Sequence, residues 1–409
     1  GTINSTGHNV KDSFKAVVDG VCGIDTITLF DASEFSVKIA GEVKDFDPTT
    51  VMDKKEVKKA DRFIQLGIKA ALEAMIDSGY VTQEDKKVDA SIADRFGMIS
   101  GSGIGGLSTI ERNSIVCETK GSRKVSPFFI PSSLANMLSG FISIEHNLRG
   151  PSLSHVTACA ASTHALNDAV KTIMIGGADR ILVVGAESAI CAAGVAGFAA
   201  MKALSTRNDE PKKSSRPFDI DRDGFVMGEG AGALVVEDLE IALARGAKIY
   251  AEIIGFGESG DANHITSPVM DGPLRAMKAA LEMVKSITGE YPKIDYINAH
   301  GTSTPVGDKN ETAAIKALFE GKDIPLVSST KGQIGHCLGA AGAIEAIFTL
   351  KALEEGIIPP TINIDNQDPE CDLDYIANVA RKANLTTVMS NNFGFGGTNG
   401  SVIFRRYEK

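Results

Sequence analysis

Cys159 lies at a point in the chain where a nucleophile is easily made. The β-favouring run from Leu153 to Thr157 ends just before it, and a run of Ala, Ser, Thr and Leu follows that predicts a helix. Free backbone N–H groups and the helix dipole at such a first turn stabilise a thiolate over a thiol. We therefore expect the dipole to lower the pKa of Cys159 without an adjacent base. The competing interpretation is a small, buried structural cysteine, which is the usual role of a free cysteine.

Other reactive side chains stand where predicted strands of the second half end. His300 follows the run IDYINA, Lys331 follows LVSST, and His336 closes the run KGQIGH. Folds of the α/β class place binding and catalytic side chains at strand ends, often beside glycines. A lone histidine is more often structural, but two histidines and a lysine at such positions favour a shared site with Cys159. The run from Phe393 to Gly397 is rich in glycine, which lets backbone N–H groups approach a substrate.

Composition and spacing exclude several other kinds of site. The six cysteines form no CxxC pair and the seven histidines form no HxxxH or HExxH pattern. Both facts argue against a metal site or a disulfide framework. The net charge of −10 argues against nucleic acid as a partner. No apolar run approaches the length that spans a membrane.

A glycine pattern after the predicted strand 96–100 has to be weighed as a dinucleotide site. Gly101, Gly103 and Gly106 spell GxGxxG. A dinucleotide-binding fold also needs a crossover helix and then an acidic residue about 20 positions later. Glu118, the nearest acidic residue at the end of an apolar run, follows too soon to leave room for that helix. Close backbone packing is therefore the better explanation of these glycines.

Strands and helices alternate along the chain. In the first half, apolar spacing predicts helices near 61–78, 134–146 and 160–175 and strands near 96–100, 181–186 and 232–237. In the second half it predicts helices near 274–284, 312–319 and 340–353 and strands near 250–255, 294–298, 326–329, 388–390 and 401–404. This alternation is typical of an α/β fold whose helices cover sheets. We expect two similar halves, residues 1–248 with the cysteine and residues 249–409 with the histidines and the lysine.

Four motifs together resemble those of a known family. In chain order they are VTACAAS, NAHGTSTPVGD, SSTKGQIGHCLGAAGAIEA and NNFGFGGTNG. They are similar to motifs of the elongating β-ketoacyl-acyl-carrier-protein synthases, the condensing enzymes of type II fatty acid synthesis. The resemblance covers almost the whole chain and, through Ile104 in GSGIGGL, is closest to the synthase II type. It implies a thiolase-like α/β fold of two pseudo-symmetric halves in a layered α-β-α-β-α arrangement.

The resemblance implies a catalytic role for several matching residues. Cys159 would be the nucleophile that carries the acyl chain. His300 and His336 would be the active-site pair that assists the loss of CO₂ from a malonyl group. Lys331 would orient this group, and Glu345 would be a buried glutamate of the same network.

The resemblance also implies contacts with the substrate. Phe395 would be a gate beside the pocket, and its N–H would pair with that of Cys159 as an oxyanion hole. Phe393 precedes it in the same loop. Thr302 and Thr304 would hold the pantetheine arm of the carrier. Acyl-pocket positions are implied at Ile104, Phe129 and Phe198.

The implied reaction is a decarboxylative condensation between an acyl-loaded and a malonyl-loaded acyl carrier protein. The only cofactor expected is the phosphopantetheine that the carrier itself brings. A thioester acceptor must be both a soft nucleophile and a good leaving group, which suits cysteine. Neutral imidazole N–H groups can stabilise the enolate oxygen that decarboxylation creates.

A local basic face could dock such an acidic carrier. Its lysines are Lys54, Lys55, Lys58 and Lys59, and Lys202 and Arg207 could extend it. A solvated helix surface is the ordinary interpretation of such spacing. Against a net charge of −10, however, the patch offers an attractive surface to an acidic partner.

Other members of the same superfamily were weighed. A thiolase would carry a second cysteine in place of His336, and a starter-type synthase would carry an asparagine in place of one histidine. A polyketide-type ketosynthase shares the Cys-His-His set and stays open. A carrier-binding scaffold without catalysis would lack the reactive groups, so the intact set disfavours it.

Three further expectations come from the family and the composition. The family is homodimeric, and six cysteines without disulfide spacing favour a reducing cytoplasm. Family members usually begin with a short strand before the position of Gly1. That strand is expected to be missing here from the centre of a sheet, which would place the start of this chain after its natural start. His155, His164, His264 and Cys337 are expected to serve structure.

Overall fold

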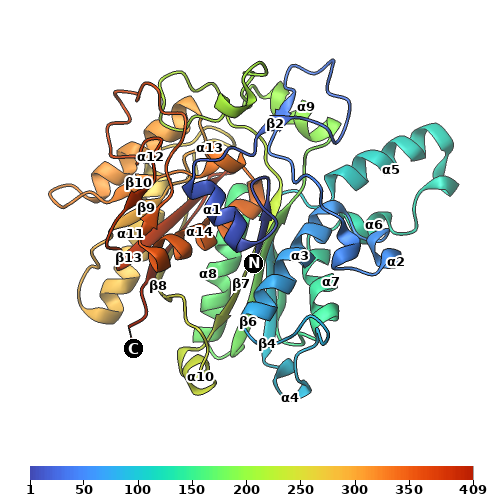
Figure 1. Ribbon diagram of the computed structural model, residues 1–409, viewed down its shortest axis with the longest axis horizontal. Coiled ribbons are helices and arrows are strands. Elements are labelled where there is room, and N and C mark those ends of the chain that lie inside the picture. Colours follow the sequence, from blue (N-terminus) through green and yellow to red (C-terminus); the bar gives the residue numbers. More distant parts are fainter. Residues whose placement is uncertain (409) are drawn as a thin grey trace.

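Two mixed β-sheets organise the chain, whose computed structural model describes residues 1–408 (Figure 1). The strands of the first sheet are β1 (Thr2–Asn4), β4 (Phe96–Gly101), β5 (Ser152–His155), β6 (Arg180–Glu187) and β7 (Gly230–Glu237). Those of the second are β8 (Glu252–Gly260), β9 (Tyr296–Asn298), β10 (Leu326–Ser328), β13 (Thr387–Gly394) and β14 (Thr398–Arg405). The strand orders are β1-β7-β6-β4-β5 and β10-β9-β13-β14-β8.

The two sheets share one topology. When the strands of each sheet are numbered along the chain, both sheets run 3-2-4-5-1. In the first sheet β4 pairs in parallel with β5 and β6, and β7 pairs antiparallel with β6 and β1. In the second sheet β9 pairs in parallel with β10 and β13, and β14 pairs antiparallel with β13 and β8. The α/β fold of two pseudo-symmetric halves is confirmed.

Helices separate and cover the sheets. Two helices, α8 (Ala161–Met174) and α14 (Ala341–Glu355), lie between the sheets and contact strands of both (Figure 1). On the outer face of the first sheet lie α3 (Arg62–Asp77) and α7 (Met137–His146). The second sheet is covered by α11 (Asp271–Thr288), against which α12 (Pro305–Leu318) packs. The result is the expected α-β-α-β-α layering.

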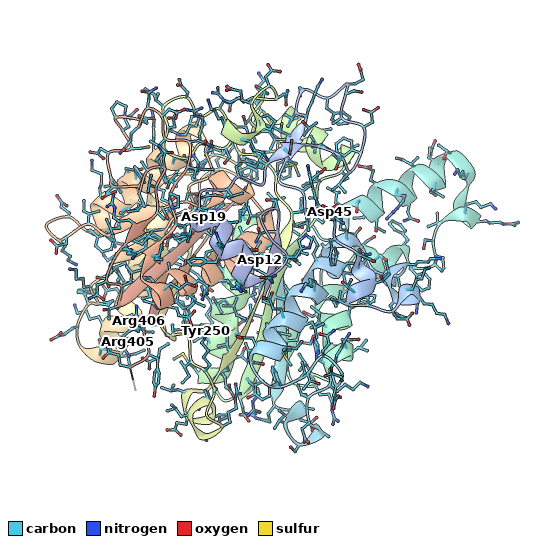
Figure 2. The ribbon with its side chains drawn as sticks, in the orientation of Figure 1. Asp12, Asp19, Asp45, Tyr250, Arg405 and Arg406 are labelled. Carbon is cyan, nitrogen blue, oxygen red and sulfur yellow. The ribbon has the colours of Figure 1, made fainter. Side chains whose placement is uncertain are left out.

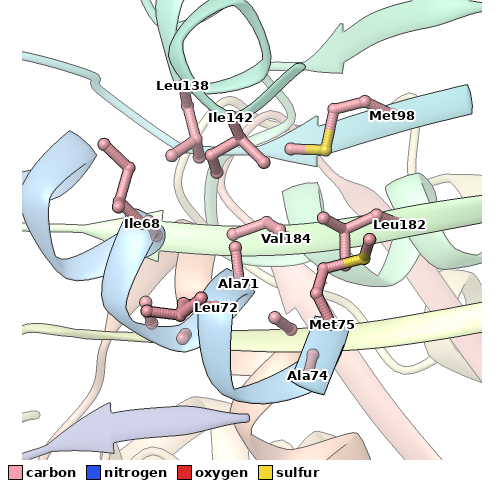
Figure 3. Packing of buried hydrophobic residues seen from close by; sticks show 14 of the residues in the cluster. Ile68, Ala71, Leu72, Ala74, Met75, Met98, Leu138, Ile142, Leu182 and Val184 are labelled. Atoms are coloured by element: carbon pink, nitrogen blue, oxygen red, sulfur yellow. The ribbon is translucent and has the colours of Figure 1, made fainter. Parts of the chain in front are cut away.

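The apolar run of β6 shows how the layers are held together. Leu182 and Val184 point to the outer layer, where they pack with Ala71 of α3 and Leu138 of α7 (Figure 3). The alternate side chain Val183 points to the inner layer formed by α8 and α14. Successive side chains of a strand face opposite sides. Where both faces of the strand are covered by apolar layers, as along residues 181–186, each successive side chain must therefore be apolar.

The remaining elements are short or peripheral. They are the helices α1 (Val10–Val18), α2 (Lys54–Val57), α4 (Ala90–Ala93), α5 (Leu107–Lys120), α6 (Phe129–Ser133), α9 (Ala192–Ala200), α10 (Leu239–Ala244) and α13 (Lys331–Ile334), and the strand pairs β2 (Asp25–Thr26) with β3 (Ile39–Ala40) and β11 (Ile357–Ile358) with β12 (Arg381–Lys382). Two single 3₁₀ turns, η3 (Ala158–Ala160) and η5 (Leu338–Ala340), lead directly into α8 and α14.

Helices with a clear apolar stripe match their predicted bounds. The side chain of Asp61 caps α3 by accepting the N–H of Phe63, and the helix ends one residue before Ser78. Asp12 and Asp19 mark the solvent side at the two ends of α1 (Figure 2), whereas Phe14 and Val17 are buried. A side-chain cap and a regular stripe are both visible in a sequence, which is why these helices could be predicted.

Two of the longer helices depart from the predicted pattern. No helix was expected at α5, whose only buried residues are Thr109 and Asn113, so it lacks the apolar stripe that would reveal it. In Figure 1 it projects from the body of the molecule. α12 begins at Pro305 instead of near Thr312, because proline is well tolerated in the first turn of a helix.

The first strand of this chain, β1, lies at an edge of its sheet. β1 pairs antiparallel with β7 from Thr2 opposite Gly232 to Asn4 opposite Gly230. β1 follows Gly1, so the expectation of a further strand before Gly1 stays a prediction. An edge strand of three residues satisfies one side of β7 and leaves few ladder groups uncovered.

Among residues 1–408, no helix combines the length and the apolar character that crossing a bilayer requires. The same residues contain no group of three or more His, Cys, Asp or Glu side chains placed to hold a metal ion.

Candidate active site

Cys159 sits in the η3 turn between β5 and α8. The residue before it, Ala158, has a left-handed backbone with φ of 49°, which is rare for a residue with a side chain. Leu338 takes the same conformation before α14, with φ of 47°. Both inner helices are thus entered through a sharp turn, and in the first half that turn carries the thiol to the junction of the two sheets.

The charge state of Cys159 differs from the one predicted. Burial raises the pKa of its thiol to about 12, while the charge of Lys331 and the backbone N–H of Phe395 act in the opposite direction. The expected lowering of the pKa by the helix dipole is therefore wrong for the unacylated chain. A desolvated sulfur favours its neutral form, and a first turn alone does not offset that cost.

Two backbone N–H groups face the sulfur. The N–H of Phe395 donates toward it, and the N–H of Cys159 itself also lowers the pKa of the thiol. A side chain on Gly394 would place its Cβ 2.9 Å from the Thr157 carbonyl oxygen and 3.1 Å from the Cys159 nitrogen. Glycine at this position therefore keeps the space beside the Cys159 N–H open. This arrangement is suited to an oxygen that gains negative charge.

The loop that carries Phe395 is held by a second loop. The N–H of Gly396 donates to the carbonyl of Ile265 (2.7 Å), and the N–H of Asp261 donates to the carbonyl of Gly397 (2.8 Å). Asp261 also accepts a hydrogen bond from the Asn399 side chain (2.7 Å). His264 accepts the N–H groups of its own loop, in agreement with a structural role.

His300 and His336 face each other in a buried space. Their ring centroids lie 5.3 Å apart with the planes nearly perpendicular. Burial and the charge of Lys331 hold the pKa of both imidazoles well below the usual value, so both rings are neutral at neutral pH. The Nδ1 atom of each ring is buried without a hydrogen-bond partner among the described residues. Such orphaned polar atoms are unusual in a folded protein and mark a site that a ligand can complete.

Lys331 and Glu345 form a buried ion pair behind the histidines. Glu345, on α14, also accepts a hydrogen bond from Asn392 of β13 (2.7 Å). Asn392 in turn accepts one from Thr163 of α8 (2.7 Å). The chain of contacts crosses from the second sheet to both inner helices, so the lysine is fixed where its charge acts on Cys159 and on both histidines.

Two acidic residues of α12 support the site and were not predicted. Glu311 accepts the backbone N–H groups of His300 (2.9 Å) and Gly301 (2.8 Å), and burial raises its pKa to about 7. Asp308 accepts the N–H of Phe218 (2.9 Å), and burial raises its pKa to about 6. Their spacing of i, i+3 places both on one helix face. This spacing of Asp308 and Glu311 was not recognised in the sequence, because the helix was expected to begin only after Glu311.

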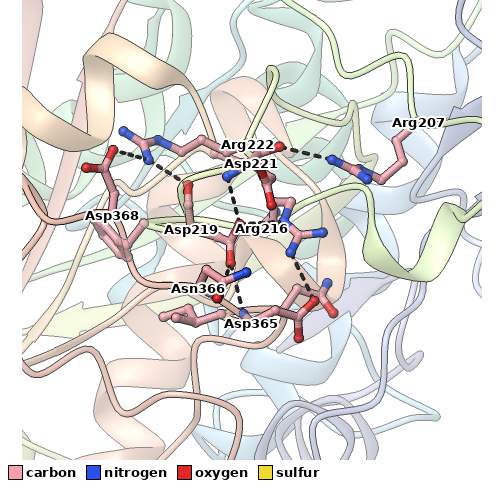
Figure 4. Close-up of polar contacts among 12 residues, drawn as sticks. Arg207, Arg216, Asp219, Asp221, Arg222, Asp365, Asn366 and Asp368 are labelled. Carbon is pink, nitrogen blue, oxygen red and sulfur yellow. Dashed lines mark hydrogen bonds and ion pairs between the residues drawn. The ribbon is translucent and has the colours of Figure 1, made fainter.

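Arginines of the long connection 205–228 hold the loop after β9. Arg222 lies between Asp308 and Asp368, and it donates to the carbonyls of Thr304 (3.1 Å) and Pro305 (2.9 Å). Figure 4 shows how Arg216 and Arg222 flank Asp219 in the same network. The hydroxyls of Thr302 and Thr304 lie 3.1 Å apart within the loop that this network fixes.

Three of the predicted pocket residues pack near the residues of the site. Ile104 and Phe198 pack against the buried apolar cluster that contains Cys159. The ring of Phe198 lies 6.4 Å from that of Phe395, and the ring of Phe393 lies 5.6 Å from that of His300. Phe129 lies instead on α6 and does not belong to that cluster. Its role in an acyl pocket stays a prediction.

The remaining histidines and Cys337 make structural contacts. His155 binds Asp168 (3.0 Å). His164 bridges Thr157 (2.7 Å) and the Asn399 carbonyl (3.1 Å). Cys337 is fully buried in the inner core, as expected for a structural thiol.

The family profile "Beta-ketoacyl synthase, N-terminal domain" matches residues 1–242, and "Beta-ketoacyl synthase, C-terminal domain" matches residues 250–365. The chain is 49% identical to a protein of Vibrio harveyi named 3-oxoacyl-[acyl-carrier-protein] synthase 2, over 99% of this chain and 97% of that protein.

Solved structures are similar as well. A β-ketoacyl synthase from Burkholderia phymatum superposes with a TM-score of 0.91 at 35% identity, over 100% of this chain and 98% of that one. A type II polyketide ketosynthase, solved in complex with its acyl-carrier protein and bound to a hexaketide, superposes with a TM-score of 0.86 at 28% identity, over 100% and 98%.

The raised pKa of Cys159 predicts its reaction with iodoacetamide. Because the thiol is neutral at neutral pH, the alkylation rate should rise about tenfold per pH unit from roughly pH 7 to 9, without a plateau. Peptide mapping by mass spectrometry gives the rate at Cys159, and the exposed Cys117 serves as an internal reference for the reagent. A rate that reaches a plateau below pH 8 would instead show that the pKa of Cys159 is lowered, as the helix dipole predicts.

Proposed function

The chain belongs to the β-ketoacyl synthase family, and we propose that its reaction runs through Cys159, His300 and His336. It is a condensing acyltransferase of fatty acid elongation, which joins an acyl chain to two carbons of a malonyl group on a carrier. One observation supports this assignment of roles above the others. A thiol and two neutral imidazoles meet in a buried space, and the charge of a single lysine, Lys331, acts on all three.

The first stage moves the acyl chain to the protein. The sulfur of Cys159 attacks the thioester carbonyl of the acyl carrier, and the oxygen gains a negative charge. The N–H groups of Cys159 and Phe395 bind that oxygen. The carrier thiol then leaves with the proton that the cysteine gives up, and the acyl group remains on the sulfur as a new thioester.

The second stage forms the carbon–carbon bond. The carboxylate of the malonyl carrier leaves as CO₂, and its bonding electrons form an enolate whose oxygen is bound by the imidazole N–H groups of His300 and His336. The enolate carbon attacks the acyl carbonyl, the Cys159 sulfur leaves, and a β-ketoacyl carrier two carbons longer is released. Burial, reinforced by the charge of Lys331, keeps the histidines neutral, and a neutral imidazole cannot simply protonate the enolate carbon.

The substrate arrives on an acyl carrier protein. The threonine hydroxyls of Thr302 and Thr304 are held beside the histidine loop and offer hydrogen bonds to the amides of a phosphopantetheine arm. This arm belongs to the substrate, and no other cofactor is assigned. The ketosynthase structure in complex with its acyl-carrier protein supports a carrier as the partner of this chain.

The basic face around α2 is the proposed dock for that carrier. Lys54, Lys55 and Lys58 are exposed, and no ion pair involves them among residues 1–408. Lys59 instead pairs with Glu56 and lies over the ring of Phe128. Lys202 is exposed as well, while Arg207 donates to the Asp221 carbonyl. Unpaired lysines on a chain of net charge −10 give a local attraction that can orient an acidic carrier.

A homodimer is proposed through the edge of the first sheet. β5 is the last strand of that sheet, so one side of it has no strand partner among the described residues. Leu153 on β5 and Val156 just after it are 47% and 57% exposed. Ile130 and Leu134 of the neighbouring α6 segment are exposed too. An open strand edge with apolar neighbours is a usual template for pairing with a second copy.

Fatty acid elongation is favoured over the polyketide alternative. The relative named 3-oxoacyl-[acyl-carrier-protein] synthase 2 is 49% identical, whereas the polyketide ketosynthase is 28% identical. All six cysteines are free, which supports the proposed cytoplasmic location. A scaffold without catalysis would not need an ion pair that keeps two buried histidines neutral.

The division of roles is tested by separating the two stages. Cys159→Ala should lose condensation by about 10³-fold or more because no acyl-enzyme forms. His300→Ala and His336→Ala should still accept the acyl chain on Cys159 but release CO₂ from malonyl carrier about 10²–10³-fold more slowly. Intact-protein mass spectrometry measures the first step and ¹⁴CO₂ release the second. His8→Ala, far from these loops in sequence, is the control, and wild-type condensation by Cys159→Ala would refute the assignment.

The carrier dock is tested by charge reversal. Lys55→Glu with Lys58→Glu should raise the apparent KM for acyl carrier about tenfold because an acidic partner is then repelled. Activity with acyl-pantetheine, which lacks the protein carrier, should stay unchanged. Lys278→Glu with Lys285→Glu, two exposed lysines on α11, is the matched control. An unchanged KM in the first variant would remove this dock.

The dimer is tested by a charge on the open edge. Leu153→Glu should convert a dimer to a monomer in light scattering coupled to size exclusion, because a buried unpaired carboxylate opposes association. Ile287→Glu, at a 64% exposed position on α11, should leave the mass unchanged. A wild-type monomer, or a Leu153→Glu dimer of wild-type affinity, would contradict the interface.

A further inference from the structure

Glu187, at the end of β6, is a buried carboxylate that the condensation cycle does not use. It is fully buried, and no Lys, Arg or His pairs with it among residues 1–408. Instead it accepts hydrogen bonds from four donors. They are the N–H groups of Gly103 (2.6 Å), Ile104 (3.2 Å) and Gly339 (3.0 Å) and the hydroxyl of Ser102 (3.1 Å).

These donors come from two separate turns. Ser102 to Ile104 follow β4 in the first half, and Gly339 lies in the η5 turn before α14 in the second half. The turns touch so closely that a Cβ on Gly339 would lie 2.1 Å from the Gly103 nitrogen. Gly103 also approaches the turn of the nucleophile, since a Cβ there would lie 3.4 Å from the Ala158 carbonyl oxygen. Glu187 is thus the common anchor of the backbone around Cys159.

Comparison of the two halves shows which position the Glu187 carboxylate occupies. Gly339 in η5 corresponds to Cys159 in η3, because each lies one residue after a left-handed residue and just before an inner helix. Glu187 ends β6 as Gly394 ends β13, and each stands opposite the first residue of the next strand. In the second half Gly394 leaves the Cys159 N–H open to a substrate oxygen. In the first half the Glu187 carboxylate itself fills the matching position.

We propose that Glu187 is a positioning residue that fixes Ile104 and so sets the discrimination between acyl chains of different length. Ile104 packs beside the cluster of Cys159 and Phe198, and its backbone N–H is held by Glu187. A carboxylate can accept all four hydrogen bonds, whereas a glutamine presents an NH₂ group to part of the same donors. Replacing Glu187 by glutamine therefore releases the turn of Ile104 without changing the volume of the side chain.

This inference rests on the proposed acyl transfer to Cys159 and is tested through it. Glu187→Gln is compared with wild type for acylation of Cys159 by hexanoyl, decanoyl and tetradecanoyl carrier, followed by intact-protein mass spectrometry. The ratio of the fastest to the slowest chain length should fall by about tenfold, the low end of what one methylene of pocket contact contributes. Release of CO₂ from malonyl carrier should stay within about twofold, since Glu187 contacts neither histidine.

Two further variants serve as a control and as a substitute for Glu187→Gln. Glu42→Gln is the matched control, because Glu42 is also buried and accepts the N–H groups of Thr28 and Leu29 in a loop without site residues. Its chain-length profile should equal that of wild type. If Glu187→Gln does not fold, Ser102→Ala removes one donor and should shift the profile in the same direction by a smaller factor.

The outcomes separate this inference from the proposed function. If wild type itself is not acylated on Cys159, the proposed function fails. If wild type is acylated but Glu187→Gln keeps the wild-type profile, the positioning role is refuted alone. A uniform change of rate at all chain lengths also refutes it, because removing the nearby negative charge would act on the Cys159 sulfur whatever the acyl chain.

Discussion

The buried pair of Lys331 and Glu345 is the interaction on which the rest of the site depends. Removing one partner of a buried pair leaves an uncompensated charge and typically costs about 3–5 kcal/mol. Burial is the main cause of the low pKa of both histidines, the charge of Lys331 lowers it further, and the same charge opposes the rise that burial imposes on the Cys159 thiol. The hydrogen-bond chain from the pair through Asn392 to Thr163 joins the second sheet to the inner helix that begins just after Cys159.

The two halves use one topology for different tasks. In the first half only two residues separate the end of β5 from the η3 turn with Cys159. In the second half the corresponding path from β10 to η5 is lengthened by α13, and this addition carries Lys331 and His336. A longer connection on one copy of a repeated unit thus supplies the charged and titratable groups that the other copy lacks. The site exists only where the copies meet.

Much of this arrangement could be predicted from the sequence, and the exceptions have physical causes. The bounds of α3 and the strand ends that carry His300 and Lys331 follow from local periodicity and turn residues. The pKa of Cys159 could not be predicted, because burial depends on the packing of segments far apart in the chain. Glu187, Asp308 and Glu311 were missed for a related reason. Each acts by accepting backbone N–H groups, and such acceptors leave no spacing pattern that distinguishes them from surface carboxylates.

The position of Cys159 at the meeting of two sheets has a thermodynamic consequence. An acyl group on Cys159 would place its oxygen between the N–H of Cys159 in the η3 turn and that of Phe395 in the loop after β13, and its chain beside Ile104 and Phe198. Each of these groups belongs to a different segment of the two halves. A group that makes favourable contacts only in the folded state stabilises that state by the free energy of those contacts. By contacting these segments together, the acyl chain would raise the free energy of unfolding of the acyl-enzyme above that of the free protein.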